Sequence, residues 1–379
     1  MRVLVLNAGS SSLKASVIET SNDATLAEST TNWRPDATDV DRRDTVVAST
    51  VAELTRGPGT ILAVGHRVVH GGSVFTGPTL VDDQALERID ALDELAPLHN
   101  HIAVATIRAA ARLLPNLDHV ACFDTAFLAV LEEEGWRYPL PDDWQARWGI
   151  RRFGFHGLSV SWAVERAAAL LNRPIADLSM IVAHLGSGSS VTAVAAGKSV
   201  DTSMGFTPLE GLMMGTRSGS IDPGILLHVL RKGMTVEEVA DALEHHSGLL
   251  GVSRLSADVA ELERAAADGD ESAALSLAIY VRRAASGIAS AATSLKHLHA
   301  LVFTGGIGEH ADIVRTAICE RLELLRVGPP QANTGDEDEV ISEPGAGARV
   351  IRIHAREDVV IARQTAELLR ADASRTTSI

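Results

Sequence analysis

Residues 4–18, LVLNAGSSSLKASVI, decide the fold of this chain. An apolar run, a short turn of small residues and a second apolar run predict two strands joined by a tight turn. The turn offers hydroxyls, backbone N–H groups and the ammonium of Lys14, and Asn7 adds an amide oxygen. These groups fit a phosphate and a hard cation, and an ordinary Ser-rich hairpin turn fits the stretch equally well. The spacing excludes a P-loop, which has two glycines before Lys and Ser or Thr.

The same pattern returns in the second half of the chain. Residues 180–194, MIVAHLGSGSSVTAV, again place a Gly/Ser turn between two apolar runs. Two such halves, each presenting a turn to phosphate, predict a duplicated α/β fold that encloses a nucleotide, and a chance likeness of two hairpins is the alternative. The irregular stretch 132–148 ends just before a new motif at Arg151, so a domain boundary is expected near residue 150.

Length, charge and cysteine content narrow the function classes. A chain of 379 residues predicts two domains. The formal charge of −15 argues against nucleic acid and against an anionic membrane surface. The two cysteines lie in apolar surroundings, which is typical of a reducing cytoplasm without disulfides. We expect neither a membrane span nor a signal peptide.

Three further stretches place charged residues next to glycines or strand ends. Arg67 lies in the β-like run that ends HRVVHGG, and Asp124 follows the short apolar strand 119–123. Arg217 lies in the Gly- and Pro-rich segment 201–223, and a long irregular segment of this kind is usually functional. A strand at residues 301–303, a glycine turn at 304–310 and a helix through Leu325 form a strand–turn–helix unit. Such a unit is typical of nucleotide-binding sites. Residues 20–58 show only weak strand signals.

Taken together, these stretches resemble the acetate kinase family. The resemblance covers almost the whole chain, and its segments are LNAGSSSLK (6–14), GHRVVHGG (65–72), FDTAF (123–127), RRFGFHG (151–157), HLGSGSSVTAV (184–194), GKSVDTSMGFTPLEGLMMGTRSG (197–219) and FTGGIGE (303–309). It implies the fold of actin, Hsp70 and sugar kinases: two duplicated ribonuclease-H-like α/β domains with a nucleotide cleft between them. Residues 1–150, with the terminal helix 361–379 packed on them, would carry the acetate site and the first phosphate turn. Residues 151–360 would carry the second phosphate turn, the nucleotide site and the dimer contacts.

The resemblance also implies a reaction. Acetate kinases transfer the γ-phosphoryl group of ATP directly and reversibly to acetate, giving ADP and acetyl phosphate, with Mg²⁺ or in its place Mn²⁺. A homodimer in the cytoplasm is expected. Because the nucleophile is already a carboxylate, the main task is to bring two anions together and to stabilise the transition-state charge.

Roles for individual residues follow from the same resemblance. The expected catalytic residues are Arg67, Asp124, His156 and Arg217. The expected substrate residues are Arg67, Val69, Leu98, Phe155 and Pro208, the last four forming the pocket for the acetate methyl group. Asn7 and Glu357 would hold the metal. The nucleotide would be bound by Ser10, Ser12, Lys14, His184, Leu185, Gly186, Ser187, Gly188, Asp258, Val259, Ala260, Gly306, Ile307, Gly308, Glu309 and His310.

Departures from the family pattern concentrate at the expected adenine site. The usual Asp-Phe-Arg is Asp258-Val259-Ala260 here, which removes an aromatic ring and a cation that would pack on the base. The residue after FDTAF is Leu128 instead of His, the glycine turn ends in His310 instead of Asn, and Ala355-Arg356 replaces the usual Thr-Asn. We therefore predict weaker discrimination for adenine than is usual.

Three other readings of the sequence stay open. A propionate kinase, or another kinase of short-chain carboxylates, differs only in the methyl pocket around Val69. A non-catalytic ATP-binding protein of this fold has no reason to keep Arg67, His156 and Arg217 together. A phosphatase would need a base aimed at water and no methyl pocket.

Overall fold

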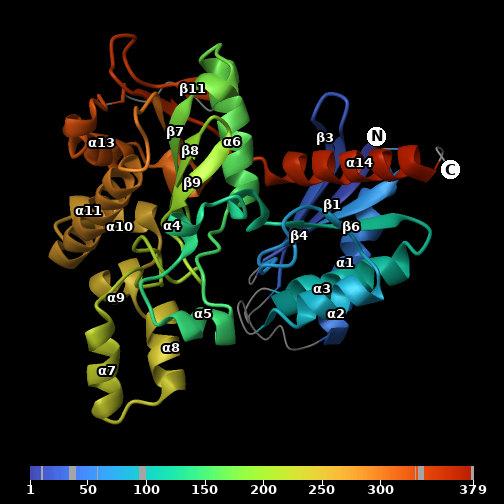
Figure 1. Ribbon diagram of the computed structural model, residues 1–379, viewed down its shortest axis with the longest axis horizontal. Coiled ribbons are helices and arrows are strands. Elements are labelled where there is room, and N and C mark those ends of the chain that lie inside the picture. The colour runs from blue at the N-terminus through green and yellow to red at the C-terminus, as the bar shows by residue number, and fades with distance from the viewer. Residues whose placement is uncertain are drawn as a thin grey trace. The chain divides into compact units, whose positions relative to one another are not determined.

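The computed structural model describes residues 1–9, 12–33, 40–57, 59–93, 100–328, 330–331 and 337–376. Contacts within the chain divide it into two compact units (Figure 1). Unit 1 consists of residues 1–129 and 356–379, and unit 2 of residues 130–355. The C-terminal segment therefore returns to the first unit, and each unit is described by itself below.

Unit 1 is built on a six-stranded mixed sheet with the order β3-β2-β1-β4-β6-β5. The hairpin predicted at the start of the chain is present as β1 and β2, with Asn7 opposite Lys14 in the antiparallel ladder. β1, β4 and β6 run parallel, so their carboxyl ends lie at one edge of the sheet. The strands are β1 (Arg2–Ala8), β2 (Ser12–Glu19), β3 (Ala24–Asn32), β4 (Ala63–Val68), β5 (Thr79–Leu80) and β6 (Asp118–Phe123).

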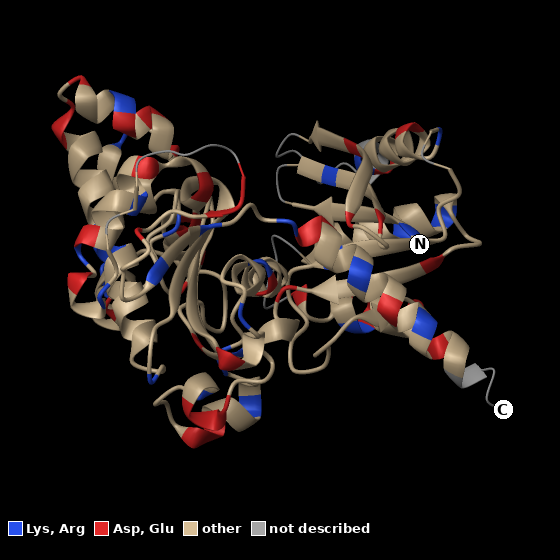
Figure 2. Ribbon diagram, turned by 90° about the horizontal axis from the view of Figure 1, so that it is seen from above, with Lys and Arg blue, Asp and Glu red and all other residues tan. Residues whose placement is uncertain are grey.

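Helices cover this sheet and form its apolar core. Buried residues of the strands pack with Val47, Val51 and Ile107 of the helices that follow β3 and β5. The last helix packs on β1, β2, β4 and β6, and Figure 2 shows acidic and basic residues along its length, as expected of a helix with one face in water. The helices are α1 (Val40–Leu54), α2 (Asp83–Asp90), α3 (Asn100–Leu113), η2 (Ala126–Leu128) and α14 (Glu357–Thr376).

The last helix can lie close to the sheet because β4 carries Gly65 at the crossing. A Cβ on Gly65 would lie 2.6 Å from Ile361 Cγ2 and 2.6 Å from Thr365 Oγ1, so only glycine fits there. This approach places the N-terminus of α14, and Glu357 with it, beside the carboxyl end of β4. A residue from the end of the chain thus reaches the edge formed by its beginning.

Unit 2 repeats the architecture of unit 1. Its sheet has the order β11-β12-β10-β7-β8-β9, which read from β9 matches unit 1 strand for strand. The pairing directions also match: β7–β8–β9 and β11–β12 are antiparallel, and β7, β10 and β12 are parallel. The strands are β7 (Ser179–Leu185), β8 (Ser189–Ala195), β9 (Lys198–Thr202), β10 (Ala300–Thr304), β11 (Glu339–Val340) and β12 (Arg349–Arg352). The predicted duplicated α/β fold is confirmed.

The helices of unit 2 lie on both faces of its sheet. Figure 1 shows α6 on one face and α10, α11 and α13 on the other. Tyr280 and Ile288 of α11 are buried in the main core of this unit. The helices are α4 (Glu133–Trp136), α5 (Asp142–Trp148), α6 (Gly157–Leu170), η3 (Ile175–Asp177), α7 (Pro223–Arg231), α8 (Val236–His245), α9 (Gly248–Ser253), α10 (Val259–Ala267), α11 (Glu271–Ala292), α12 (Gly305–His310), α13 (Asp312–Glu320) and η4 (Glu323–Leu325).

Residues 130–150 pack with unit 2 instead of ending the first unit. The backbone N–H of Arg152 donates to the carbonyl of Trp136 at 2.7 Å. The Arg152 guanidinium stacks over the Tyr138 ring, 5.1 Å from its centroid, and pairs with Glu210 at 2.9 Å. Tyr138 donates to the same carboxylate. These contacts place the division at residues 129 and 130, whereas composition pointed to residue 150.

Two local expectations differ from the structure. The segment 20–58 contains α1, whose Val47, Val51 and Leu54 recur at helical spacing and are buried. The glycine turn expected at residues 304–310 contains the short helix α12, and the helix expected to follow it through Leu325 is divided into α13 and η4. Both cysteines are buried free thiols, as predicted. In the described residues no helix is both long and apolar enough to cross a membrane.

Candidate functional site

Arg67 is the centre of a charged cluster in unit 1. It lies near the end of β4, and Asp124 directly follows β6 at the same edge of the sheet. Arg67 Nη2 donates to Asp124 Oδ2 at 2.5 Å and Arg67 Nε to Asp124 Oδ1 at 3.1 Å, which is a bidentate pair. Arg67 Nη1 donates to Asn7 Oδ1 at 3.2 Å. All three side chains come from the carboxyl ends of adjacent parallel strands.

Glu357 completes the cluster from the other end of the chain. Asn7 Nδ2 donates to Glu357 Oε2 at 3.1 Å, and the same oxygen lies 3.7 Å from Arg67 Nε. Because Glu357 is in the first turn of α14, the helix dipole favours its negative charge. The two residues expected to hold a metal are thus hydrogen-bonded to each other across 350 residues of sequence.

The cluster carries one more negative than positive charge. Asp124 is 1% exposed. Burial and the nearby Glu357 carboxylate together raise the pKa of Asp124 to about 6, against the opposing effect of Arg67. A hard cation would relieve this repulsion between two carboxylates, and oxygen ligands are the ones that Mg²⁺ prefers. The donor set therefore fits Mg²⁺.

The turn between β1 and β2, which the sequence predicts to bind phosphate, borders the same cluster. Because Lys14 lies opposite Asn7 in the ladder, both side chains point to one face of the sheet. Lys14 is exposed and Ser12 is partly buried. Gly9 N–H donates to the carbonyl of Ser12 at 2.8 Å and closes the turn. Ser10, also expected here, lies outside the described residues.

The residues expected around the acetate methyl group come from different parts of the chain. Val69 is buried in unit 1, Phe155 is buried in unit 2, and Pro208 is partly buried in unit 2. Leu98 lies outside the described residues. Val69 therefore belongs to unit 1, whereas Phe155 and Pro208 belong to unit 2.

Two histidines meet near the turn between β7 and β8, which the sequence predicts to bind phosphate. His184 is in β7, and His156 precedes α6 with a left-handed φ of 59°. Their rings stack with centroids 4.1 Å apart. His156 Nε2 lies 3.4 Å, and Arg217 Nη2 3.1 Å, from the point that a Cβ on Gly188 would occupy. Three nitrogen-bearing side chains thus converge on a stretch of bare backbone, which is suited to an anion.

Arg217 is desolvated without an acidic partner. Burial lowers the pKa of its guanidinium, and Glu244 acts weakly in the opposite direction. Arg217 Nη1 donates to the carbonyl of Pro208 at 2.9 Å. No carboxylate lies within ion-pairing distance of Arg217 in the described part of the chain. A partly buried cation held by a neutral carbonyl retains its charge for an anionic ligand.

The backbone around Arg217 is held by the N-terminus of α9. Met214 N–H donates to the carbonyl of Arg217 at 3.1 Å, and Leu249 N–H donates to the carbonyl of Met214 at 2.9 Å. Gly248 makes this contact possible, because its Cβ would lie 2.2 Å from the Met214 carbonyl oxygen. The segment 201–223 is irregular as expected, but hydrogen bonds fix its backbone around Arg217.

The remaining nucleotide candidates lie in three places in unit 2. Leu185 is buried, Ser187 is exposed, and Gly186 lies between them in the second turn. Asp258 caps α10 by accepting from Glu261 N–H at 2.9 Å, Val259 is buried in the core, and Ala260 is exposed. The third group is α12 with Gly306, Ile307, Gly308, Glu309 and His310.

Within α12, Gly306 leaves the backbone open, and Glu309 stabilises the turn by hydrogen bonds. A Cβ on Gly306 would meet no atom within 4 Å, so the backbone is open to a ligand there. Glu309 Oε1 accepts from Gly305 N–H at 2.9 Å and from Ala355 N–H at 3.0 Å, which makes it a brace for the turn. The side chain of His310 is 67% exposed.

Several residues at this site had no assigned role in the sequence. Arg152 donates to the carbonyls of Thr202, Ser203 and Met204 at 3.0–3.2 Å and so anchors the segment that leads to Pro208. In the sequence, only the pair of adjacent arginines in RRFGFHG pointed to Arg152. Ser159 and Ser190 bond to the two histidines, and a serine three residues after His156 was the signal for the first of them.

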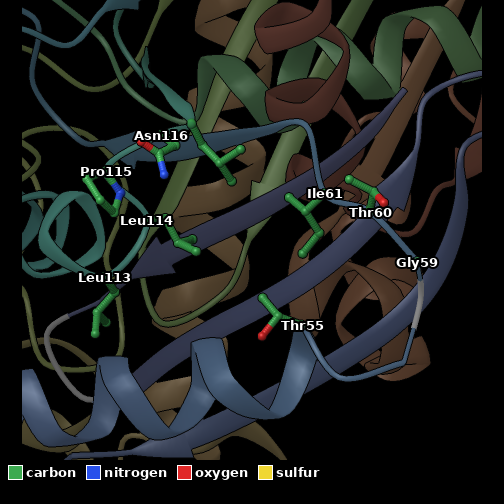
Figure 3. A pocket seen from close by; sticks show the side chains of 9 residues that line it. Thr55, Gly59, Thr60, Ile61, Leu113, Leu114, Pro115 and Asn116 are labelled. Carbon is green, nitrogen blue, oxygen red and sulfur yellow. The ribbon is translucent and has the colours of Figure 1, made fainter.

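A separate pocket of about 310 Å³ lies in unit 1 (Figure 3). It is lined by Thr55, Gly59, Thr60, Ile61, Leu113, Leu114, Pro115, Asn116 and Leu117. None of these side chains is charged, and none was a candidate site residue. The pocket adds nothing to the chemistry described above.

Comparison with known proteins identifies the family. The model of the acetokinase family matches residues 2–363. The chain belongs to the acetokinase family. An acetate kinase of Geobacillus sp. (strain WCH70) is 39% identical over 392 residues, which cover 97% of this chain and 98% of that protein.

Solved structures agree with this family assignment. The crystal structure of Porphyromonas gingivalis acetate kinase aligns with a TM-score of 0.86 and 32% identity over 97% of this chain and 99% of that one. A propionate kinase from Francisella tularensis subsp. tularensis SCHU S4 aligns with a TM-score of 0.84 and 35% identity over the same shares of the two chains, 97% and 99%. The family places the chain among enzymes that transfer a phosphoryl group to a carboxylate.

Proposed function

We propose that this chain is an acetate kinase that catalyses ATP + acetate ⇌ ADP + acetyl phosphate. An acetate oxygen forms a bond to the γ-phosphorus, the bond from that phosphorus to the bridging oxygen breaks, and its electron pair leaves with ADP. The observation that carries the proposal is the convergence of Arg217, His156 and the backbone of Gly188 in unit 2. Donors that converge on glycine backbone suit the charge of a phosphoryl group in transit.

Each unit supplies a different part of the chemistry. In unit 1, Arg67 is proposed to bind the acetate carboxylate, with Asp124 fixing the plane of its guanidinium. In unit 2, Arg217 and His156 are proposed to donate to the transferring phosphoryl group, and His184 to the phosphates of the nucleotide. Ser12 and Lys14 add donors for the phosphates, and Val69, Phe155 and Pro208, with Leu98, would contact the methyl group.

Mg²⁺, or Mn²⁺ in its place, is proposed as the metal of this reaction. Asn7 and Glu357, with Asp124 beside them, are the residues that would hold it. When bound, the metal supplies positive charge that neutralises phosphate oxygens. The protein itself orients Arg67 and keeps both carboxylates at the edge of the sheet.

We also propose a cytoplasmic homodimer, as the sequence suggested. Support comes from the hairpin of α7 and α8, whose apolar side chains are exposed. They are Ile225 (50%), Leu227 (53%), Leu230 (37%), Met234 (37%) and Val236 (67%). A second copy of the chain would cover this apolar surface.

Kinetics with crossed substrates test the proposed function. We expect acetate-dependent release of ADP, with propionate used less well because an extra methylene costs about 1–3 kcal/mol in a tight pocket. The likeness to a propionate kinase makes propionate the second candidate substrate. Because Val259 is in the core and Ala260 carries no ring or cation, kcat/KM for GTP or ITP should be comparable to that for ATP. ADP release that does not need acetate would contradict the kinase assignment, and strict use of ATP would contradict the base prediction.

The pH dependence of the reaction should report on Asp124. Its pKa of about 6 means that the ionised form, which holds Arg67 by two hydrogen bonds, increases as the pH rises through 6. We therefore expect kcat/KM for acetate to fall below about pH 6. Dividing kcat/KM of Asp124→Asn by kcat/KM of the unmodified enzyme cancels the titration of the substrates. This ratio should change between pH 5 and 8. A constant ratio from pH 5 to 8 would rule out Asp124 as the titrating group.

A further inference from the structure

Two serines hold the stacked histidines by crossed hydrogen bonds. Ser159 of α6 bonds to His184 of β7, with 2.8 Å between Oγ and Nδ1. Ser190 of β8 bonds to His156 at the start of α6, with 2.9 Å between Oγ and Nδ1. His184 and Ser190 are partners in the β7–β8 ladder, so the helix and the hairpin each give one histidine and one serine. Each of the two hydrogen bonds therefore joins α6 to the β7–β8 hairpin, in opposite senses.

The environment of the serines decides where their protons point. Ser159 and Ser190 are both 0% exposed. In the part of the chain that the structure describes, the imidazole is the only hydrogen-bond partner of either hydroxyl. A buried O–H without an acceptor costs more than a hydroxyl oxygen with an unused lone pair. Each hydroxyl therefore donates to Nδ1, and a neutral imidazole that accepts at Nδ1 carries its proton on Nε2.

The Nε2 atoms of both rings face glycine backbone. His156 Nε2 lies 3.4 Å from the Cβ position of Gly188, and His184 Nε2 lies 3.2 Å from that of Gly305. Two imidazolium rings stacked at 4.1 Å would repel each other, whereas two neutral rings do not. The stack therefore suits a pair of neutral donors.

We propose that Ser159 and Ser190 are positioning residues for the transfer reaction. They hold His184 and His156, respectively, as neutral imidazoles with the proton on Nε2, so that both rings donate to phosphate oxygens. The donors are then oriented before charge develops on the phosphoryl group, which avoids reorganisation in the transition state. This inference deepens the proposed function and rests on it.

Nuclear magnetic resonance of the full chain labelled with [¹⁵N]histidine tests the proton positions without an activity assay. Long-range ¹H–¹⁵N correlations distinguish the two neutral tautomers, and His156→Gln and His184→Gln assign the signals. In the unmodified protein we expect the Nε2–H pattern for both rings. Finding Nδ1–H or an imidazolium in either ring at neutral pH would overturn the proposal, and this result needs no serine variant.

The serine variants test the crossed pairing. Ser190→Ala should bring the Nδ1–H pattern or exchange broadening to His156 alone. Ser159→Ala should do so to His184 alone, although Ser159 is close in sequence to His156. Thr192→Val is the matched control, because it removes another buried hydroxyl from β8 that bonds to Thr202 instead of a histidine. A Ser159→Ala variant that disturbs His156 and leaves His184 unchanged would contradict the crossed arrangement.

Kinetics separate positioning from general stability. Each serine variant should lower kcat about 10-fold, the effect of one lost hydrogen bond, with KM values within about two-fold. Thr192→Val should keep kcat. Equal loss in both kinetic constants, or unchanged kcat, would contradict a positioning role. If the unmodified chain shows the expected tautomers and no acetate-dependent ADP release, the proposed function fails separately from the proton positions.

Discussion

Replacing Arg217 with alanine is expected to lower kcat by about 10³-fold, the scale seen when a transition-state arginine is removed. Its guanidinium is desolvated, it is held by the Pro208 carbonyl, and its Nη2 points to the Gly188 backbone. Since the contact with the phosphoryl group is made mainly in the transition state, KM for ATP should change little. Steady-state and single-turnover kinetics measure the two effects separately.

Two further variants sharpen this prediction. Arg217→Lys should also be poor, because a lysine ammonium is a point charge without a planar fork. Arg282→Ala removes an exposed arginine from α11 in the same unit and should leave kcat unchanged. A loss of ATP affinity as large as the loss of kcat in Arg217→Ala would contradict the assigned role.

Replacing Arg67 with alanine should damage both activity and stability. Activity falls because the proposed carboxylate-binding group is lost, by about 10²-fold or more. Stability falls because Asp124, 1% exposed, keeps a negative charge next to Glu357 without its partner. Removing one member of a buried ion pair costs about 3–5 kcal/mol.

The stability loss should depend on pH. Arg67 lowers the pKa of Asp124, so without it the pKa rises above the present value of about 6. Protonation relieves the buried charge at low pH, so the loss of stability grows between about pH 6 and the raised pKa and is complete above it. Urea unfolding of Arg67→Ala should therefore show a larger loss at pH 8 than at pH 5.

A double variant separates the two effects of this substitution. Arg67→Ala with Asp124→Asn should recover much of the stability at pH 8, because no unpaired charge remains, but none of the activity. Equal losses of stability at the two pH values would show that the ion pair is not their source.

Local patterns in the sequence predicted much of the architecture. Both hairpins were predicted, because alternating runs of apolar residues around small residues favour strand–turn–strand whatever surrounds them. Helix α1 was missed, although its Val47, Val51 and Leu54 recur at helical spacing. Helix α12 was also missed, because its three glycines favour a turn over a helix.

The motifs named residues that lie close together within each unit, Arg67 and Asp124 in unit 1 and His156 and Arg217 in unit 2, but not the contacts that hold them. Arg67, Asp124, His156 and Arg217 were named because the motifs around them resemble those of the acetate kinase family. Sequence patterns carry no information on the carbonyl that holds Arg217 or on the tyrosine and carboxylate that hold Arg152. Those contacts depend on loop conformations that distant parts of the chain impose.

The opening stretch shows where this division falls. By itself LVLNAGSSSLKASVI determines a hairpin, because apolar periodicity and turn chemistry act over a few residues. The tertiary structure decides what Asn7 contacts. Close packing of α14 on Gly65 brings Glu357 to within 3.1 Å of Asn7. The crossed serine–histidine bonds are likewise tertiary, since they need α6 seated on the β7–β8 hairpin.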